Sequence, residues 1–257
     1  MSDRDPTSEL GDLARALAAQ LERRSRWGER RLTRPTAPPG PAAEATHDIL
    51  YPAAPGAAAA RTTVPGTPAI AHDAQSLAVL ESAVAACTAC ELHRTRTQTV
   101  FADGTGAARV LFIGEAPGQH EDEQGVPFVG RAGALLTDII QKGMKLRRED
   151  VYIANVLKCR PPGNRDPKPE EKASCTPFLD RQIELLDPKV IITLGLHASQ
   201  HVLKSTASMG RLRGKVHTLH GRRVVATYHP AYLLRSPQMK KECWKDIQLA
   251  MRELGLL

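Results

Sequence analysis

The sequence predicts an α/β fold: a single three-layer α/β/α domain with a central, mostly parallel sheet, preceded by a disordered N-terminal extension. Residues 110–113 and 190–194 carry large apolar residues at consecutive, not alternate, positions. Strands that are apolar on both faces are typical of parallel sheets that helices cover on both sides. Segments with helical periodicity lie between such runs, which is the element order of α/β proteins. The domain is expected to occupy residues 73–257.

Residues 1–72 lack the composition of a packed domain. One amphipathic helix, which could dock on another protein, is predicted within residues 7–33 because four leucines recur at helical spacing: Leu10, Leu13, Leu17 and Leu21. From Pro35 to Pro68 the chain has eight prolines and few large apolar residues. Such a segment cannot bury a core, so it is expected to be a disordered linker.

The first half of the domain is predicted to alternate helix, strand, helix and strand. Helix 76–86 carries its large apolar residues on one face, and strand 109–114 is an apolar run closed by a glycine. Helix 132–142 has four large aliphatic residues on one side, and strand 151–156 is again mostly apolar.

The second half continues the alternation and ends with a hairpin and a helix. Helix 169–186 starts with a proline followed by two glutamates, a sequence typical of helix N-termini. Strand 190–194 ends at a glycine and leads into the next helix. His220 and Gly221 are predicted to form the turn of the hairpin. The remaining expected elements are helix 197–203, strands 216–219 and 222–228, and helix 238–254.

The chain carries a net charge of +7, and nearly all of the excess lies in residues 73–257. A basic domain favours polyanionic partners such as nucleic acid. Aromatic residues make up 4% of the chain, which argues against single-strand binding by stacked bases. The chain has neither an apolar run long enough to cross a bilayer nor a secretory signal, so a cytoplasmic protein without membrane contact is expected.

Four of the five cysteines have a pattern that suggests a metal site. Cys87 and Cys90 form a C-x2-C pair, and Cys159 and Cys175 follow downstream. Four thiolates can hold one tetrahedral Zn²⁺ ion or one [4Fe–4S] cluster, and the spacing does not separate these possibilities. The alternative is scattered core cysteines, although Cys159 lies in a polar segment unlike a core. Cys243 is alone in the last predicted helix and is expected to be a buried small hydrophobe.

The turn after strand 109–114 is the first place where a ligand site is expected. Open α/β sheets bind ligands at the carboxyl ends of their strands. Glu115 starts this turn, and Glu121 and Phe128 follow in the same glycine-containing loop. Carboxylates and an aromatic ring are thereby brought together, although an ordinary strand–helix connection with solvated acids would have a similar sequence.

Four motifs stand in order within residues 85–254: GEAPG (114–118), VPFVGRAG (126–133), NVLKCRPPGNRDP (155–167) and HPAYLLR (229–235). Together they resemble the family 4 uracil-DNA glycosylases, bacterial and archaeal base-excision repair enzymes with an iron–sulfur cluster. The resemblance implies an enzyme that flips uracil out of DNA, hydrolyses its N-glycosidic bond and so starts repair. No lysine is placed like a Schiff-base nucleophile, so a monofunctional glycosylase is expected. The resemblance also implies a [4Fe–4S] cluster on four cysteines: Cys87, Cys90, Cys159 and Cys175.

Two neighbouring groups of the superfamily fit less well. The uracil-DNA crosslinking members carry Gln in place of Glu115 and a basic insert before a reactive histidine. Residues 210–214 of this chain resemble the ordinary loop instead. The broader-specificity family 5 enzymes resemble GLAPA in the first motif, which this chain lacks.

The implied chemistry assigns roles to residues at strand ends. Breaking the C1′–N1 bond leaves negative charge on uracil O2, so a donor aimed at O2 and a placed water are needed. His229 is the candidate donor, Asn155 can pair with uracil N3–H and O4, and Glu115 is the candidate for orienting the water. Family 1 enzymes have Asp at the position of Ala116, so the group that activates the water stays open. Phe128 would stack on the flipped base, and Glu121 would exclude thymine by blocking its methyl group. The other substrate-binding candidates are Gly114 and Ala116.

The implied DNA contacts follow the later motifs. Segment 232–235 is expected to be a loop over the DNA, where Leu233 or Leu234 would fill the hole left by the flipped base. A monomer acting on uracil-containing DNA is expected. The alternative is a non-catalytic DNA-binding protein with a four-cysteine structural metal, which would leave the strand-end residues unexplained. The candidate phosphate contacts are Arg160, Arg165, Lys168, Arg213 and Arg235.

Overall fold

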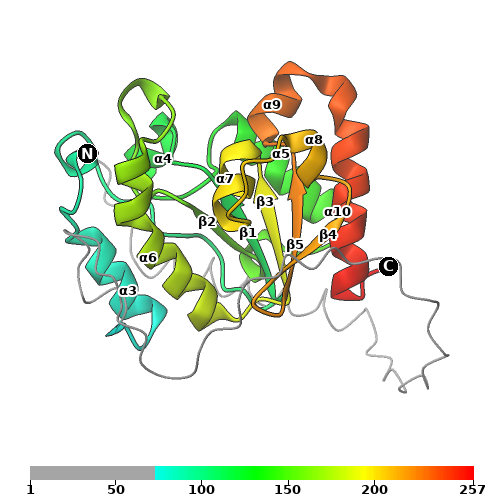
Figure 1. The fold of residues 1–257 in the computed structure, drawn as a ribbon, viewed down its shortest axis with the longest axis horizontal. Coiled ribbons are helices and arrows are strands. Elements are labelled where there is room, and N and C mark those ends of the chain that lie inside the picture. The colour runs from blue at the N-terminus through cyan, green and yellow to red at the C-terminus, as the bar shows by residue number, and fades with distance from the viewer. Residues whose placement is uncertain (1–72) are drawn as a thin grey trace, which may run out of the picture. The chain divides into compact units, whose positions relative to one another are not determined.

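Five strands form one sheet in the order β2-β1-β3-β5-β4, in a computed structural model that describes residues 73–257 (Figure 1). Strand β1 pairs in parallel with β2 and β3, and β3 pairs in parallel with β5, whereas β4 runs antiparallel to β5. The predicted mostly parallel sheet is confirmed. The strands are β1 Val110–Gly114, β2 Tyr152–Asn155, β3 Val190–Leu194, β4 Val216–Leu219 and β5 Arg222–Thr227.

The N-terminal extension lies outside the described residues. The amphipathic helix within residues 7–33, the linker and the contact of this segment with another protein therefore stay predictions. The domain boundary at residue 73 also stays a prediction.

Helices follow most of the strands, as the βαβ pattern predicts. The α-helices are α3 Leu77–Ala85, α4 Gln119–Gln124, α5 Arg131–Asp138, α6 Pro169–Leu186, α7 Leu196–Val202, α8 Met209–Leu212, α9 Pro230–Arg235 and α10 Lys240–Leu254. The shorter turns are η1 Glu91–Arg94, η2 Ile139–Gly143, η3 Arg148–Asp150, η4 Pro162–Asn164 and η5 Pro237–Met239. None of the helices in residues 73–257 has both the length and the apolar character needed to cross a lipid bilayer.

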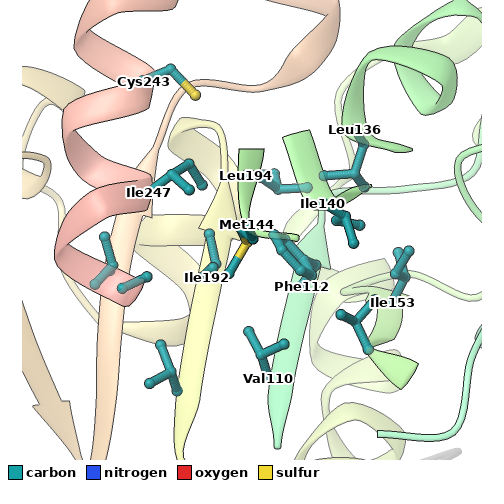
Figure 2. Close-up of a cluster of buried hydrophobic side chains, with 14 of the residues drawn as sticks. Val110, Phe112, Leu136, Ile140, Met144, Ile153, Ile192, Leu194, Cys243 and Ile247 are labelled. Carbon is teal, nitrogen blue, oxygen red and sulfur yellow. The ribbon is translucent and has the colours of Figure 1, made fainter. Parts of the chain in front are cut away.

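One face of the sheet packs against α5, η2 and α10. Figure 2 shows Phe112 and Ile192 of the sheet among Leu136, Ile140 and Ile247 of these helical segments. All of the residues in β1 and β3 are buried, so their side chains meet a helix layer on either face. This explains why apolar residues occupy consecutive positions in these strands.

The opposite face packs against α6, α7 and α8. Leu179 of α6 and Val202 of α7 belong to the same buried cluster as Leu111 and Val224 of the sheet. Helix α3 packs on α6 in turn, through a smaller cluster that contains Phe178. The two helix layers and the sheet between them make the predicted three-layer architecture.

The hairpin of β4 and β5 turns at His220 and Gly221, as predicted. Their φ angles are 47° and 79°, so both lie in the left-handed region. Two-residue turns with positive φ at both positions match the right-handed twist of paired strands. The pairing continues from Leu219 opposite Arg222 to Val216 opposite Val225.

Several segments differ from the prediction. Residues 119–124, expected in the loop after strand 109–114, form helix α4, so Glu121 lies on a helix. The helix expected over 132–142 leaves the α form at Asp138 and ends in the π-helical turn η2. The last helix begins at Lys240, because a 3₁₀ turn occupies the preceding residues. Segment 232–235, expected to be a loop, belongs to helix α9. Pro230 at its first position suits a helix start, because the ring fixes a helical φ and the missing N–H is not needed there.

Candidate active site and cysteine site

A cleft of about 750 Å³ opens at the carboxyl end of the sheet. Glu115 after β1, Asn155 at the end of β2, His197 after β3 and His229 after β5 all line it. The parallel strands explain this arrangement, because their carboxyl ends meet at one edge of the sheet. The predicted substrate-binding residues that line the cleft are Glu115, Ala116, Glu121, Phe128, Asn155 and His229.

Asn155 presents an unpaired acceptor at this cleft. The residue is 2% exposed, and none of the described residues donates a hydrogen bond to its Oδ1. Gly114 permits the close packing beside it, since a Cβ at Gly114 would lie 2.3 Å from Asn155 Oδ1. A buried acceptor without a partner costs about 1–3 kcal/mol. A ligand that donates a hydrogen bond to Oδ1 would remove this cost.

His229 presents a donor. It precedes α9, and its Nδ1 accepts a 3.1 Å hydrogen bond from the N–H of Ala231. The neutral ring therefore carries its proton on Nε2. Burial is the main cause that lowers the pKa of His229 to about 4, and nearby Arg235 adds to this effect while Glu121 opposes it. At neutral pH the ring is therefore an uncharged donor through Nε2.

Phe128 packs against this histidine. The two rings are stacked, with 5.6 Å between their centroids and 30° between their planes. The backbone of Phe128 has a φ of 56°, which is uncommon for a bulky residue. Glu121 holds the next two residues, since its Oε1 accepts hydrogen bonds from the N–H groups of Val129 (3.1 Å) and Gly130 (3.2 Å). Glu121 thus fixes the Phe128 loop, and its role against a thymine methyl stays a prediction.

Glu115 shares the cleft with two residues that the sequence analysis did not single out. One side-chain oxygen or nitrogen of each of Glu115, Asp166 and His197 lies within 4.8 Å of the other two. His197 Nε2 is 3.7 Å from Asp166 Oδ2. Burial raises the pKa of Glu115, His197 lowers it, Asp166 raises it and Lys172 lowers it. His197 comes three residues after the end of the predicted strand 190–194, and this position near a strand end could have identified it.

The side chains predicted to contact phosphates differ in their exposure and in whether other side chains bind them. Arg235 is exposed at the cleft and Lys168 is exposed on the surface. Arg165 also lines the cleft, but its Nη1 donates a 2.9 Å hydrogen bond to Glu171 Oε2. Arg160 donates through Nε to a neighbouring asparagine side chain at 2.8 Å. These four residues stay candidates for DNA contact.

Two predicted DNA contacts need correction. The side chain of Arg213 is 14% exposed, and its Nε and Nη2 each donate a 3.0 Å hydrogen bond to the buried carboxylate of Asp246. Leu233 is 1% exposed and belongs to the core cluster, whereas Leu234 is 36% exposed. Because α9 is a helix, successive residues point in different directions. Only Leu234 of the two leucines faces solvent, and Arg213 is engaged inside the domain.

The four predicted cysteine ligands come together. Arg96 donates from Nη1 to Cys159 Sγ at 3.2 Å, and the backbone N–H of Lys158 donates to Cys175 Sγ at 3.3 Å. Cys243 lies apart from them, on the side of α10 that faces the core, as predicted (Figure 2). The residues that line one small cavity beside α6 include Cys87, Cys90, Cys159 and Cys175.

The cavity offers four thiols to a metal group, and two of these sulfurs accept hydrogen bonds from Arg96 and Lys158. Four thiols fit either one Zn²⁺ ion or one [4Fe–4S] cluster.

Lys158 connects the cysteine cavity to the cleft. Its side chain is buried, and Nζ donates hydrogen bonds to the backbone oxygen of Asn155 (2.7 Å) and to Gln182 Oε1 (2.5 Å). Its backbone N–H donates to Cys175, as described above. One residue thus fixes both the end of β2 and one cysteine.

Comparison with known proteins gives consistent matches. The sequence pattern described as "Uracil DNA glycosylase superfamily" matches residues 101–248. A "Type-4 uracil-DNA glycosylase" of Thermotoga maritima is 47% identical over 176 residues, which are 67% of this chain and 91% of that protein. The proteins of the same name from Archaeoglobus fulgidus and Sulfurisphaera tokodaii are 44% and 41% identical. Their matches cover 68% and 70% of this chain, and 91% and 86% of the respective relatives.

Proposed function

This chain belongs to the uracil DNA glycosylase superfamily, in its type-4 family, and from that premise we propose how it acts. It takes uracil that has been flipped out of DNA and hydrolyses the bond between the base and C1′ of the sugar. Extrusion of the base costs a few kcal/mol of stacking and pairing, least for a base in a weak pair. The reaction starts base-excision repair without cutting the strand.

The unpaired Oδ1 of Asn155 is the observation that carries this proposal. Uracil N3–H can donate to this oxygen, and the side-chain amide of Asn155 can donate to uracil O4. Cytosine offers an acceptor at N3 and a donor at N4, so its edge has the opposite polarity. Asn155 would therefore accept uracil and leave cytosine with two mismatched contacts.

His229 supplies the donor for the leaving base. As the bond to C1′ breaks, negative charge develops on uracil O2, and Nε2–H of the neutral ring donates a hydrogen bond there. The donor is held in place before the reaction, because Nδ1 is bound to the backbone. One fixed donor of this kind contributes about 3–4 kcal/mol to stabilisation of the transition state.

Phe128 and Glu115 are the other two residues of the proposed active site, one for the base and one for the water. The flipped base would lie against the ring of Phe128. Hydrogen bonds from the two following residues to Glu121 hold the Phe128 loop in place. Glu115 lines the same cleft and, when ionised, would orient the water that adds to C1′. The proton of this water would pass to Glu115 as the new bond forms.

The surface around the cleft would hold the DNA. Arg235 and Arg165 line the cleft, and Arg160 and Lys168 lie in the segment beside it, so these side chains would contact phosphates. Leu234 would enter the space that the flipped base vacates.

The cysteine site would hold a [4Fe–4S] cluster on Cys87, Cys90, Cys159 and Cys175. The convergence of the four cysteines on one cavity and the donors from Arg96 and Lys158 support this assignment. When bound, the cluster would join chain segments far apart in sequence and so hold the segment that carries Arg160 and Lys168.

The test is uracil release from an end-labelled oligonucleotide under single-turnover conditions, with thymine and cytosine oligonucleotides as controls. The wild-type protein should produce an abasic site from uracil that breaks only after alkali treatment. Asn155→Asp should lower uracil release by about 100-fold, equivalent to about 2.7 kcal/mol, because a carboxylate cannot donate to O4. When protonated, the same side chain can pair with cytosine, so weak cytosine release is expected.

A wild-type protein that binds this DNA without releasing uracil would instead support the alternative, a DNA-binding protein with a structural metal. Unchanged uracil release by Asn155→Asp would show that the base is not read where we place it.

A further inference from the structure

We propose that His197 and Asp166 act with Glu115 as one acid–base group, and that both are positioning residues for the attacking water. This inference rests on the function proposed above, in which Glu115 orients that water. It adds two residues that the motifs of the sequence analysis do not assign to the reaction.

The geometry brings the three side chains together from separate parts of the fold. Glu115 follows β1, Asp166 precedes α6, and His197 lies in the first turn of α7. All three line the cleft, and one polar atom of each lies within 4.8 Å of the others. His197 Nε2 and Asp166 Oδ2 are 3.7 Å apart, close enough for an ion pair.

Few other groups in the cleft can assist the water. Nδ1 of His229 accepts a hydrogen bond from the backbone, and its Nε2–H is assigned to uracil O2. Position 116 is an alanine and offers no carboxylate. Glu121 is engaged with the backbone of the Phe128 loop. Two carboxylates remain, the exposed Asp166 and the half-buried Glu115, and the charge state of Glu115 depends on the groups around it.

His197 and Asp166 act on this charge state in opposite directions. The charged groups that face Glu115 are His197, Asp166 and Lys172. Burial raises the pKa of Glu115, and Asp166 raises it further, whereas His197 and Lys172 favour the ionised form. The side chain of Asp166 is 82% exposed and that of His197 is 37% exposed, so solvent screens Asp166 more strongly.

The experiment is the pH dependence of single-turnover uracil release by the intact protein, in buffers freed of divalent cations. The wild-type rate should fall as the pH falls through the pKa of Glu115, because the ionised carboxylate is required. His197→Gln removes the imidazole that lowers the pKa of Glu115, so this acid limb should move to higher pH by about 0.5 to 1 unit. Asp166→Asn should move the limb to lower pH by a smaller amount, and the double variant should lie between the two.

A purely structural role for the pair gives a different result. If the His197–Asp166 contact only supports the rim of the cleft, both variants should lower the rate at every pH and leave the acid limb in place. That outcome would overturn the inference, as would shifts of the same sign in both variants. His120→Gln is the matched control, because His120 forms a similar exposed pair with Glu123, at 3.6 Å, on α4. Its acid limb should coincide with that of the wild type.

A second measurement does not depend on activity. The carboxyl resonance of Glu115 can be followed by ¹³C NMR in protein with labelled glutamate and assigned by its loss in Glu115→Gln. Its titration midpoint should move upward in His197→Gln and downward in Asp166→Asn. If the wild type releases no uracil, the proposed function fails, and the NMR titration still decides whether the three residues interact. If uracil is released but neither midpoint nor limb moves, only this inference is wrong.

Discussion

At the scale of single residues, His229 shows how one ring can both support the backbone and serve the reaction. Nδ1 accepts from the Ala231 N–H, and this contact decides that the proton resides on Nε2. Because burial lowers the pKa of the ring to about 4, its charge does not change near neutral pH. A neutral donor of this kind gains strength as charge builds up on uracil O2.

Replacing His229 with alanine should lower single-turnover uracil release by about 10²–10³-fold, the usual effect of one fixed donor to a developing oxyanion. Affinity for uracil-containing DNA should change little, since this hydrogen bond strengthens mainly in the transition state. Quenched-flow release and equilibrium binding would measure the two effects separately. His120→Ala is the control for loss of a nearby exposed histidine. A His229→Ala protein with the parent rate would remove this residue from the mechanism.

Arg213 and Arg235 form a matched pair, because one charge is paired inside the domain and the other is exposed at the cleft. Arg235→Ala should weaken DNA binding and reduce the slope of log affinity against log salt by about 1, as loss of one phosphate contact predicts. Arg213→Ala should leave this slope unchanged. It should instead destabilise the domain by about 3 kcal/mol, because the buried carboxylate of Asp246 loses its charged partner.

Salt titrations of DNA binding and chemical unfolding would check both arginine variants. A reduced salt slope in Arg213→Ala would show that this side chain reaches DNA after a rearrangement of the segment between α8 and β4.

At the scale of elements, loops beside the cleft depend on close backbone contacts. A Cβ at Gly133, in the first turn of α5, would lie 1.8 Å from the backbone oxygen of Phe128. Any larger residue at Gly133 would therefore push the Phe128 loop away from the helix. Gly133 of the second motif thus permits close packing between a loop and a helix.

Helix α9 separates the functions of two adjacent leucines. Leu233→Ala should destabilise the domain by about 2–5 kcal/mol, because the residue is 1% exposed in the core cluster. Leu234→Ala should change the free energy of unfolding by less than about 0.5 kcal/mol. It should slow uracil release from duplex DNA more than from single strands, since only a duplex has a hole to fill.

Urea unfolding and parallel rate measurements on both substrates would test the leucine pair. Equal loss on single and double strands in Leu234→Ala would contradict insertion into the duplex.

At the scale of the whole domain, the cysteine cavity and the cleft are connected rather than separate. Lys158 donates to Asn155 through its side chain and to Cys175 through its backbone. If the cysteines hold a metal group as proposed, its loss should disturb the end of β2 and the proposed reading of uracil. This connection would give the metal group a structural role in a hydrolytic enzyme.

The purified protein should be brown, with broad absorbance near about 400 nm from iron–sulfur ligation. Cys159→Ala should lose both this colour and much of the folded structure, because the ligand and its packing are lost together. Cys243→Ala is the matched control and should keep the colour, since Cys243 lies on α10 and faces the core (Figure 2). Absorbance and iron content per chain are the measurements. A colourless protein that is purified anaerobically and contains zinc without iron would contradict the cluster.

The order of the elements could be predicted because it depends on local patterns. Consecutive apolar residues identified β1 and β3, and His220-Gly221 identified the hairpin turn, since both signals lie within a few residues. The strand-end rule predicted a ligand site at Glu115, and the motif resemblance added Asn155 and His229, which line the same cleft. The motif resemblance implied a [4Fe–4S] cluster on the four cysteines. Their spacing alone did not distinguish a zinc site from an iron–sulfur site.

The sequence by itself thus determined the α/β/α fold, the family and the main residues of the cleft. Tertiary structure decided which polar groups are free. Arg213 and Arg235 are both arginines in basic segments, but packing against Asp246 engages the first and leaves the second exposed. Asp166 and His197 are far apart in the chain, and only the meeting of strand ends places them beside Glu115. Burial and pairing depend on residues distant in sequence, so no local pattern can encode them.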